Sequence, residues 1–577
     1  MQHLTVQQRK KEGIHYTPHA LAVFVAQQIC NLADISPGTD CLRVLDPAVG
    51  DGELLCSLLN EINASKSVRV EATAFDTDLI ALRQADARVS SSSFGKTKTI
   101  WRGENFLDFA ISTSSEESLG PLFSSGNAGG RFDLVIANPP YVRTQALGRQ
   151  RARDIARRFG LKGRVDLYYA FLLAISEVLK PGGIGGVIVS NRFLSTQAGG
   201  SVREQLLKRY DLLHVWDLGD TKLFEAAVLP AVLLLRKKDK PTNRKSRARF
   251  TSIYLCEGKG SRSGQTESIF DVVEGSGSFV LPDMSRFRVT QGNLDAGNKP
   301  DDVWRLSNQK NDAWLRCVDE HTGLRFADVG KVRVGVKTTA DKVFISSNWN
   351  ELPVGDRPEL LKPLITHHIA RRFKAMSADQ QREILYTHHM ECGRKRPVDL
   401  SSHPHAAKYL ESHRKQLEAR KYVKDAGRKW FEIWVPQDPS AWKQPKLVFR
   451  DISKEPTFWM DLSGAVVNGD CYWMMADSNQ KERLLWVALG VANSRFIEAY
   501  YDTKYNNKLY AGRRRFMTQY VEDFPLPPPA SKAAKQIEEC SHAIFDRLDQ
   551  ADCAALQVEL DEVVANAFGL GIEEVAR

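Results

Sequence analysis

The sequence predicts an α/β fold, with a doubly wound, mainly parallel sheet in the first 240 residues, an α+β region after it and helices at the C-terminal end. Short apolar runs alternate with helical patterns up to about residue 240, as βαβ units require. Beyond that point, Gly/Ser-rich pieces separate irregular strand-like runs. Amphipathic helical spacing starts at Ser531, after the proline-rich break PLPPPA (525–530).

Six apolar runs in the first part have the length and composition of buried strands. They are Leu42–Leu45, Glu71–Phe75, Leu134–Ala137, Gly185–Val189, Leu212–Asp217 and Ala231–Leu235. Between the third and fourth runs, residues 165–183 have helical spacing. Pro181-Gly182-Gly183 predicts the end of that helix, because proline and glycine do not continue one.

Low-complexity stretches predict the domain boundaries. Ser/Gly-rich material at 111–130 interrupts the α/β pattern, and DKPTNRKSRARF (239–250) lies where that pattern ends, so we expect a boundary near residue 240. The predicted parts are 1–240, 241–530 and 531–577. Strand-like runs in the middle part include KVRVGVKTT (331–339) and PKLVFRDI (445–452).

The composition is that of an ordinary globular protein with a mild basic excess. The formal net charge is +10, which favours a polyanionic partner such as nucleic acid. Nine cysteines form no CxxC pair, and no apolar run approaches the roughly 20 residues that span a bilayer. The N-terminal MQHLTVQQRKKEG lacks the apolar core of a signal peptide, so we expect a cytoplasmic protein with no membrane partner.

Polar and small residues follow three successive predicted strands. Gly50 and Gly52 let the backbone approach a ligand closely in the turn LDPAVGDG (45–52), ahead of a helix N-terminus. Asp76 ends the next strand, where an acid accepts hydrogen bonds from ribose hydroxyls. Asn105 and Phe106 follow a third, where an amide and an aromatic ring together suit a purine. Each residue could instead cap a helix or shape a turn, but their order along one sheet predicts a nucleoside site.

A fourth strand end carries Asn138-Pro139-Pro140-Tyr141. An exocyclic aromatic amine is a poor nucleophile until acceptors hold its hydrogens and localise its lone pair. The side-chain oxygen of Asn138 and the carbonyl of Pro139 are candidate acceptors, because proline brings a fixed φ and no competing N–H. Tyr141 offers a flat face on which a base can stack. The motif therefore predicts a site in which a planar amine attacks an electrophile, without a metal or a covalent nucleophile.

With these motifs in this order, the sequence resembles the γ-class adenine-N6 DNA methyltransferases of the Taq and Eco57 type, which use S-adenosylmethionine. The segment EGIHYTPHALAVFVAQQI (12–29) resembles the family's N-terminal cofactor segment, which implies that Thr17 contacts the methionine part. LDPAVGDG resembles its first motif, which implies that Asp46, Ala48 and Gly50 face the cofactor. Asp76 matches the ribose ligand.

Further matches extend the resemblance. Asn105 stands where the family usually has an aspartate that reads the cofactor adenine, with Asp108 as the alternative, and Phe106 follows as the packing aromatic. Asn138, Pro139, Pro140 and Tyr141 match the catalytic motif directly. Phe224, in LGDTKLFEAAVLPAVLLLRK (218–237), matches the second aromatic that contacts a flipped base.

The resemblance implies a Rossmann-like class I methyltransferase domain over 1–240 and a target-recognition domain over 241–530. It implies S-adenosylmethionine as cofactor, duplex DNA as partner, and N6 of a flipped adenine as acceptor, in a restriction-modification or related defence system with a separate cognate endonuclease. Adenine in RNA, a protein glutamine amide, or an inactive DNA-binding subunit stay open as alternatives. An integral nuclease is not expected, because no PD-(D/E)xK pattern precedes the cofactor motif.

Basic stretches are candidate phosphate contacts. Eight basic residues and one acid lie between Arg143 and Arg164, directly after the catalytic motif, and a solvated helix face is the alternative interpretation. Further candidates are Arg371-Arg372, the stretch 413–430 and Arg513-Arg514-Arg515. THHMEC (387–392) groups two histidines and a cysteine, but adjacent histidines make poor joint ligands, so no metal site is predicted.

Overall fold

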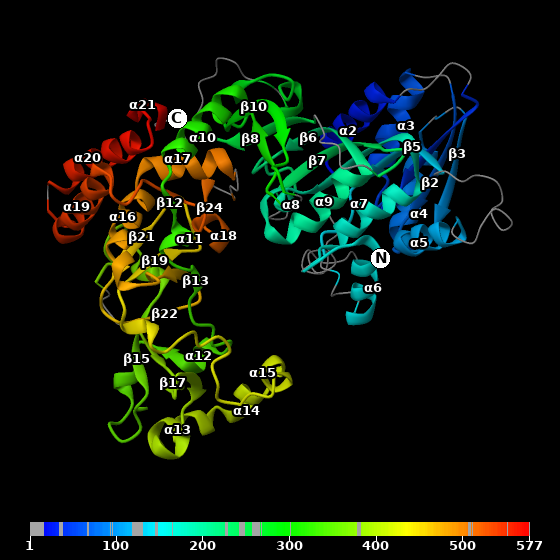
Figure 1. Ribbon diagram of the computed structural model, residues 1–577. Helices are drawn as coiled ribbons and strands as arrows, with labels where there is room; N and C mark the ends of the chain where they lie inside the picture. The colour runs from blue at the N-terminus through cyan, green and yellow to red at the C-terminus, as the bar shows by residue number, and fades with distance from the viewer. Residues whose placement is uncertain are drawn as a thin grey trace. The chain divides into compact units, whose positions relative to one another are not determined.

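The computed structural model describes the chain in two compact units, coloured by residue number in Figure 1. The first unit consists of 1–309 with 505–512, and the second of 310–504 with 513–577. The description leaves out 1–16, 34–38, 66–67, 93, 95, 118–130, 143, 145–147, 164, 225–228, 242–247, 257–265, 267, 300–301, 378–381, 506–508, 510–511, 551 and 576–577.

The first unit is built on one 11-stranded sheet with strand order β11-β10-β8-β6-β7-β5-β4-β1-β2-β3 and β9 paired to β10. The strands that carry the predicted motifs pair in parallel, and β7 is antiparallel to both of its neighbours. The strands in chain order are β1 Cys41–Asp46, β2 Arg69–Phe75, β3 Thr97–Arg102, β4 Phe132–Ala137, β5 Leu179–Ser190, β6 Tyr210–Asp217, β7 Pro230–Lys237, β8 Arg249–Leu255, β9 Gly277–Val280, β10 Arg286–Asp295 and β11 Arg305–Ser307.

Helices cover both faces of this sheet, as predicted for a doubly wound fold. Alternate residues of β4 enter different cores: Val135 and Ala137 pack on one side, and Leu134 and Ile136 on the other. The first side is covered by α5 Phe106–Glu117, α7 Leu167–Val178 and α9 Gly200–Arg209. The second side is covered by α2 His19–Leu32, α3 Glu53–Ser65 and α4 Leu79–Ser90.

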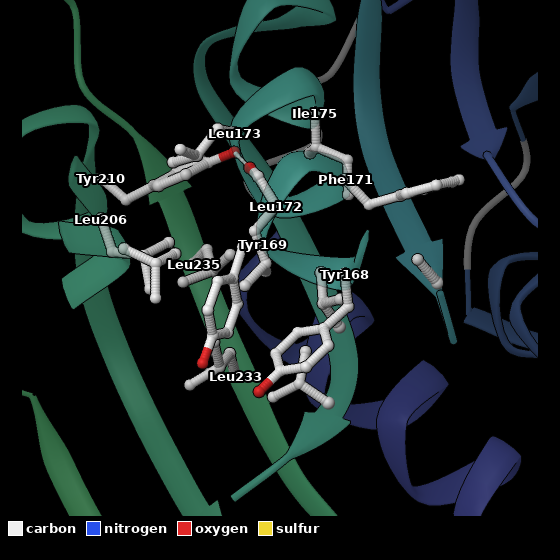
Figure 2. Packing of buried hydrophobic residues seen from close by; sticks show 14 of the residues in the cluster. Tyr168, Tyr169, Phe171, Leu172, Leu173, Ile175, Leu206, Tyr210, Leu233 and Leu235 are labelled. Carbon is white, nitrogen blue, oxygen red and sulfur yellow. Dashed lines mark hydrogen bonds between the residues drawn. The ribbon is translucent and has the colours of Figure 1, made fainter. Parts of the chain in front are cut away.

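The helix α7 is buried nearly all round, which explains its almost uninterrupted apolar sequence. Figure 2 shows its aromatic and leucine side chains interleaved with Leu206 of α9 and with Leu233 and Leu235 of β7. The hydroxyl of Tyr210 donates to the carbonyl of Leu172 at 2.7 Å, so the one polar group that β6 brings to this core is satisfied.

A glycine in β5, Gly186, lets α2 lie close to the sheet. A Cβ built on Gly186 would stand 2.7 Å from Cδ1 of Ile29 and 2.8 Å from Cγ1 of Val25. Any larger residue at this position would therefore push the helix away from the strand. The position of α2 matters for function because the residues just before it, Thr17 and Pro18, lie beside the candidate site described below.

All six predicted strands of the first part are present, and each extends one or more residues beyond its predicted bounds. The predicted end of the helix at Pro181-Gly182-Gly183 is wrong: α7 ends at Val178, and β5 begins at Leu179. The register shift between Phe132 and Leu134 lets β4 pair with this early part of β5. The Pro-Gly-Gly turn signal thus lies inside an irregular strand.

The sheet continues past the predicted boundary near residue 240. Strand β8 pairs in parallel with β6, and β10 and β11 extend the same sheet, so the division between the compact units falls at Gln309. Of the predicted break at 111–130, α5 occupies the start as far as Glu117, and 118–130 lies outside the described residues. The first strands of the predicted recognition domain therefore belong to the large sheet of the first unit.

The second unit is α+β, with short strands and an apolar core cluster that contains Trp442, Trp459 and Trp473. Its main sheet has the order β13-β23-β19-β21, and another has β14-β16-β15-β22. The predicted run 445–452 forms β19 and β20, whereas 331–339 forms only the two-residue β13. The strands are β12 Leu324–Arg325, β13 Arg333–Val334, β14 Ile345–Ser346, β15 Leu361–Ile365, β16 Glu383–Leu385, β17 His388–Glu391, β18 Arg394–Pro397, β19 Lys446–Arg450, β20 Ile452–Ser453, β21 Phe458–Asp461, β22 Val466–Val467, β23 Cys471–Met474, β24 Arg514–Arg515 and β25 Pro525–Leu526.

Helices complete the second unit. The predicted helix start at Ser531 is confirmed: its side chain accepts from the N–H of Ala534 at 3.1 Å and caps α19. The longer helices are α10 Gln309–His321, α13 Pro404–Ser412, α16 Arg483–Ala492, α17 Arg495–Lys504, α19 Lys532–Arg547 and α20 Cys553–Ala567. In the part of the chain that the structure describes, no helix is long and apolar enough to cross a membrane.

Candidate active site

A cavity of about 520 Å³ lies at the carboxyl ends of β1 to β4. Strand β1 pairs with β2 on one side and with β4 on the other, so the chain order reverses at this point of the sheet. Open α/β sheets bind ligands at such a crevice. The cavity is lined by Thr17, Pro47, Ala48, Val49, Gly50, Asp51, Glu53, Leu54, Asp76, Thr77, Asp78, Glu104, Asn105, Phe106, Asn138, Pro140, Val142, Leu167 and Phe171.

The turn after β1 needs both of its glycines. Gly50 and Gly52 have φ of +54° and +85°, in the left-handed region that disfavours side chains. A Cβ on Gly52 would also approach Ala85 to 2.9 Å, whereas one on Gly50 would meet nothing within 4 Å. The first glycine therefore leaves open space beside the cavity, and the second lets α4 pack against the turn.

The Asp76 carboxylate holds this turn in place. It accepts from the N–H of Gly50 at 2.9 Å and from that of Asp78 at 2.8 Å. Asp78, in turn, caps α4 by accepting from Ile80 and Ala81. The sequence alone could not say which aspartate was the helix cap; the structure assigns the cap to Asp78 and brings Asp76 to the cavity wall.

The lining is acidic. It includes the five carboxylates of Asp51, Glu53, Asp76, Asp78 and Glu104, and no lysine or arginine stands among its described residues. Asp51 and Glu53 share an ion pair with Arg88, which does not line the cavity. Burial raises the pKa of both Asp51 and Asp76 above its ordinary value. This field favours a cationic ligand and opposes phosphates.

Asp46 is fully buried at the end of β1 and does not line the cavity itself. Its Oδ1 accepts from the N–H of Ala48 at 3.1 Å, and its Oδ2 meets no donor among the described residues. Burial, with a smaller contribution from the charges of Asp76 and Asp51, raises the pKa of Asp46 to about 8. A buried acceptor without a partner costs stability.

We expect stability to fall with rising pH because of Asp46. Between its ordinary pKa of 3.8 and its folded pKa of about 8, the folded chain keeps a proton that the unfolded chain has released. The Asp46→Asn variant, which cannot ionise, should therefore match the wild type near the lower value and exceed it by a few kcal/mol above the upper value. Urea unfolding at several pH values measures this, and a difference that does not vary with pH would contradict it.

Asn105 and Phe106 lie at the start of α5, beside the cavity. The Oδ1 of Asn105 accepts from the N–H of Leu107 at 2.9 Å. The ring of Phe106 is 1% exposed and packs edge-on against Phe75 at 5.5 Å. The alternative residue, Asp108, does not line the cavity and forms an ion pair with Arg151 at 2.7 Å. The geometry therefore favours Asn105 over Asp108.

The catalytic motif continues the wall of the same cavity. The Nδ2 of Asn138 donates to Oγ1 of Thr17 at 3.1 Å, which joins the motif to the segment before α2. The hydroxyl of Tyr141 donates to Oδ1 of Asn138 at 2.7 Å. Pro140 lines the cavity with Asn138, while Pro139 is buried and does not. These two hydrogen bonds fix the direction in which the amide points.

The ring of Tyr141 is half-buried and lies edge-on to Tyr168, with 5.8 Å between the ring centroids. Burial raises the pKa of the Tyr141 hydroxyl well above its usual range, so it stays protonated and donates. Phe224 is 7% exposed in the apolar core on the α2 side of the sheet and does not line the cavity. Tyr16, which precedes Thr17 in the segment that resembles the family's cofactor segment, lies outside the described residues.

Sequence reasoning missed several lining residues. Val142 follows the catalytic motif directly, and Leu167 and Phe171 stand four positions apart on α7, so both face the cavity. Their apolar character gave no functional signal, because most residues of α7 serve the core. Glu53 could have been suspected from its position in the first turn of α3, beside the glycine turn.

The basic residues predicted to meet phosphates fall into two groups. Those of α6 (Arg149–Phe159) that can be described are exposed, and their ion pairs, such as Arg157 with Asp154, are ones that solvent weakens. In the second unit, Arg371 pairs with Asp549, Arg514 with Asp502 and Arg515 with Asp451. These last arginines hold the unit together, which explains their clustering without a phosphate.

Comparison with known proteins agrees with this architecture. Residues 52–224 match the family model of the Eco57I restriction-modification methylase, and 397–526 match that of the TaqI-like C-terminal specificity domain. The type II methyltransferase M.BanIII of Aneurinibacillus aneurinilyticus is 37% identical over 571 residues, 97% of this chain and 98% of that protein. The type II methyltransferase M.PaeR7I of Pseudomonas aeruginosa is 24% identical over 92% of this chain and 88% of its own.

Among solved structures, the DrdV–DNA complex determined by electron cryomicroscopy resembles the fold with a TM-score of 0.50 at 11% identity. The match covers 93% of this chain and 57% of that one. The near full-length match at 37% identity and the two family models agree with the glycine turn, the Asn-Pro-Pro-Tyr motif and the second α+β unit. The chain therefore belongs to the type II restriction-modification methyltransferases and is a DNA methyltransferase.

Proposed function

We propose that the protein transfers the methyl group of S-adenosylmethionine to N6 of an adenine flipped out of duplex DNA. The observation that carries this proposal is that Asn138 shares one cavity with Asp76 and Asn105. A cavity that joins a nucleoside-type wall to a site for a planar amine suits transfer between two such ligands. Flipping is needed because a duplex buries the adenine amine inside its stack.

The lining fits S-adenosylmethionine chemically. When bound, this cofactor supplies a methyl group on a positively charged sulfur, together with an ammonium group. Such positive charge would stabilise the five lining carboxylates and lower the raised pKa of Asp46. The same carboxylates would repel a phosphate. The volume of about 520 Å³ is within the range of small-ligand sites.

Each predicted cofactor residue has a role in this proposal. The carboxylate of Asp76 accepts from backbone N–H groups and has further lone pairs, with which it would accept from the ribose hydroxyls. The side-chain oxygen of Asn105 likewise has a second lone pair, with which it would accept from the adenine amine. Phe106 would pack on the purine, and the backbone of Ala48 and Gly50 would border the ligand. Thr17 would reach the methionine part, and Asp46 would act by charge from behind the wall.

The catalytic residues would act by positioning. Asn138 Oδ1 would hold one amine hydrogen, and the carbonyl of Pro139, which does not line the cavity, would hold the other after a local rearrangement, so that the lone pair localises on nitrogen. Because Thr17 holds Nδ2, the amide would keep its oxygen directed at the amine. Tyr141 would stack on the base after its hydroxyl leaves Asn138. Contact of the base with Phe224 would need a rearrangement, since Phe224 is buried.

The direct test is methyl transfer from radiolabelled S-adenosylmethionine to plasmid DNA, followed by nucleoside analysis. The expected product is N6-methyladenine. N4-methylcytosine would contradict the proposed acceptor, and label in ribosomal RNA or in a protein glutamine would support the alternatives instead. We also propose a separate endonuclease with the same recognition sequence as partner, which co-expression with protection of the methylated DNA would test.

The tyrosine offers a separate prediction. Tyr141→Phe keeps the ring and removes the hydroxyl that donates to Asn138, so methyl transfer should stay within a few-fold of the wild type. Tyr141→Ala should lower kcat/KM for DNA by roughly 5- to 150-fold, which corresponds to the free energy of stacking one base on an aromatic ring. Steady-state kinetics with both variants checks this. Equal losses would show that the hydroxyl, rather than the ring, matters.

A further inference from the structure

The stretch THHMEC, which has no role in the site above, belongs to an exposed β-hairpin in the second unit. Strands β17 and β18 pair in antiparallel register, with His389 opposite Arg396 and Glu391 opposite Arg394. Cys392 and Gly393 form the two-residue turn with φ of +48° and +71°, the geometry of a tight hairpin turn that matches strand twist. The ribbon is therefore a defined element.

The base of the hairpin is anchored on one face. His388 is 4% exposed, and its Nε2 lies 3.4 Å from Oε2 of Glu432, while Thr387 donates to the carbonyl of Phe431 at 3.2 Å. Side chains alternate between the two faces of a ribbon. The face with His388, Met390 and Lys395 thus turns toward the body of the unit. The opposite face, with His389, Glu391, Arg394 and Arg396, turns away from it.

Every residue from His389 to Arg396 is exposed. Within the described part of the chain, Arg394, Lys395 and Arg396 make no side-chain hydrogen bond or ion pair that would hold their charges, in contrast to Arg371, Arg514 and Arg515. A two-stranded ribbon that buries only the residue at its base adds little to stability. Burial lowers the pKa of His388, and the charges of Lys395 and Arg428 lower it further against the opposing effect of Glu432. In Figure 1, β17 lies near α13, at the opposite end of the unit from α19 and α20.

We propose that this hairpin enters the major groove of the DNA substrate, with Arg394 and Arg396 directed at base edges and Lys395 at a phosphate. A major groove about 12 Å wide admits a two-stranded ribbon. Arginine pairs with guanine through two hydrogen bonds, and His389 and Glu391 add a donor or acceptor on the same face. This inference rests on duplex DNA as the substrate of the proposed reaction, and it is independent of which base is methylated.

The test uses the full chain and two short labelled duplexes. One contains the sequence that the wild type methylates, found by sequencing modified plasmid DNA, and the other lacks it. Arg394→Ala or Arg396→Ala should weaken binding to the first by roughly 5- to 150-fold and affect the second little. Lys395→Ala should weaken both alike and reduce the slope of log affinity against log salt by about one.

Lys532→Ala is the matched control, because it removes an equally exposed charge from α19 and should change neither affinity. Thermal unfolding of each variant should match the wild type, since the replaced side chains are exposed. The proposal would be overturned if the arginine variants bound both duplexes as tightly as the wild type does. It would also be overturned if they lost the same affinity for both duplexes. If the wild type methylates no DNA, the proposed function fails, and the hairpin is then decided on a mixed-sequence duplex, to which Lys395→Ala should bind more weakly than the wild type and for which unchanged binding would overturn the proposal.

Cys392 supplies an independent readout. Of the nine free cysteines it is the exposed one, and it stands at the tip of the ribbon. Its reaction with a maleimide should slow several-fold when the duplex that contains the methylation sequence is added, and Cys392→Ser should remove the fast-reacting thiol. A labelling rate that the duplex leaves unchanged would count against insertion of the tip into the groove.

Discussion

Replacing Asn138 by alanine should lower the rate of methyl transfer by roughly a hundred- to a thousand-fold, while the affinity for S-adenosylmethionine changes little. The amide oxygen is the side-chain acceptor proposed for the amine, and removal of one preorganised polar group from an active site typically has this effect. Single-turnover transfer and calorimetric titration of the cofactor measure the two quantities separately.

Two further variants sharpen that experiment. Thr17→Val removes the acceptor that holds Nδ2 of Asn138, so it should lower the rate less than the alanine change, because the oxygen remains but its direction is freed. Thr17→Ser keeps the hydroxyl and should retain most of the activity. Full activity in Asn138→Ala would eliminate the proposed mechanism, whereas a loss of cofactor binding would point to a structural role for the residue.

A second large effect is expected in the second unit, on stability. The side chain of Lys446 is fully buried, its Nζ lies 2.6 Å from Oδ2 of Asp461, and it donates to the carbonyl of Trp442 at 2.7 Å. Burial lowers the pKa of Lys446 in spite of the neighbouring carboxylate. Lys446→Met leaves the Asp461 charge buried without its partner, which should cost about 3–5 kcal/mol of unfolding free energy.

The double variant Lys446→Met, Asp461→Leu separates charge from packing. It removes both buried charges between the paired strands β19 and β21, and should recover most of the stability that the single change loses. Urea unfolding followed by tryptophan fluorescence is suited to this, since Trp442, Trp459 and Trp473 belong to the same core. A double variant no more stable than the single one would assign the loss to packing.

The parts of the fold that depend on local patterns could be predicted from the sequence. Apolar runs give the strands β1, β2, β4, β5, β6 and β7, since a strand that helices cover on both faces of the sheet is apolar on both faces, whether its neighbours are parallel or, as for β7, antiparallel. The end of α7 could not, because Pro181 and Gly182 suggest a helix stop but lie in an irregular strand. The continuation of the sheet through β8 also escaped prediction, because strand pairing between distant segments leaves no local signature.

In the candidate site, too, local patterns predict some features, and others depend on contacts between distant segments. The order of strand-end motifs indicated Gly50, Asp76, Asn105 and Asn138, and all of them line one cavity. The roles within the wall depend on contacts between distant segments, such as the bond from Asn138 to Thr17, which lies 121 positions earlier. No spacing rule predicts that Phe224 is buried in the core on the α2 side of the sheet, or that the Oδ2 of Asp46 meets no donor among the residues that the structure describes.

The hydrogen bond from Tyr141 to Asn138 bears on which bases the site accepts. Without a base, the amide oxygen is not left bare to water, because the hydroxyl satisfies it. A base with an exocyclic amine exchanges that bond for one of its own and gains the ring contact. A base without such an amine would strip the oxygen of its partner, at a cost of about 1–3 kcal/mol. In the proposed reaction, the resting hydrogen bond would thus disfavour a base that offers no N–H to this oxygen before any chemistry begins.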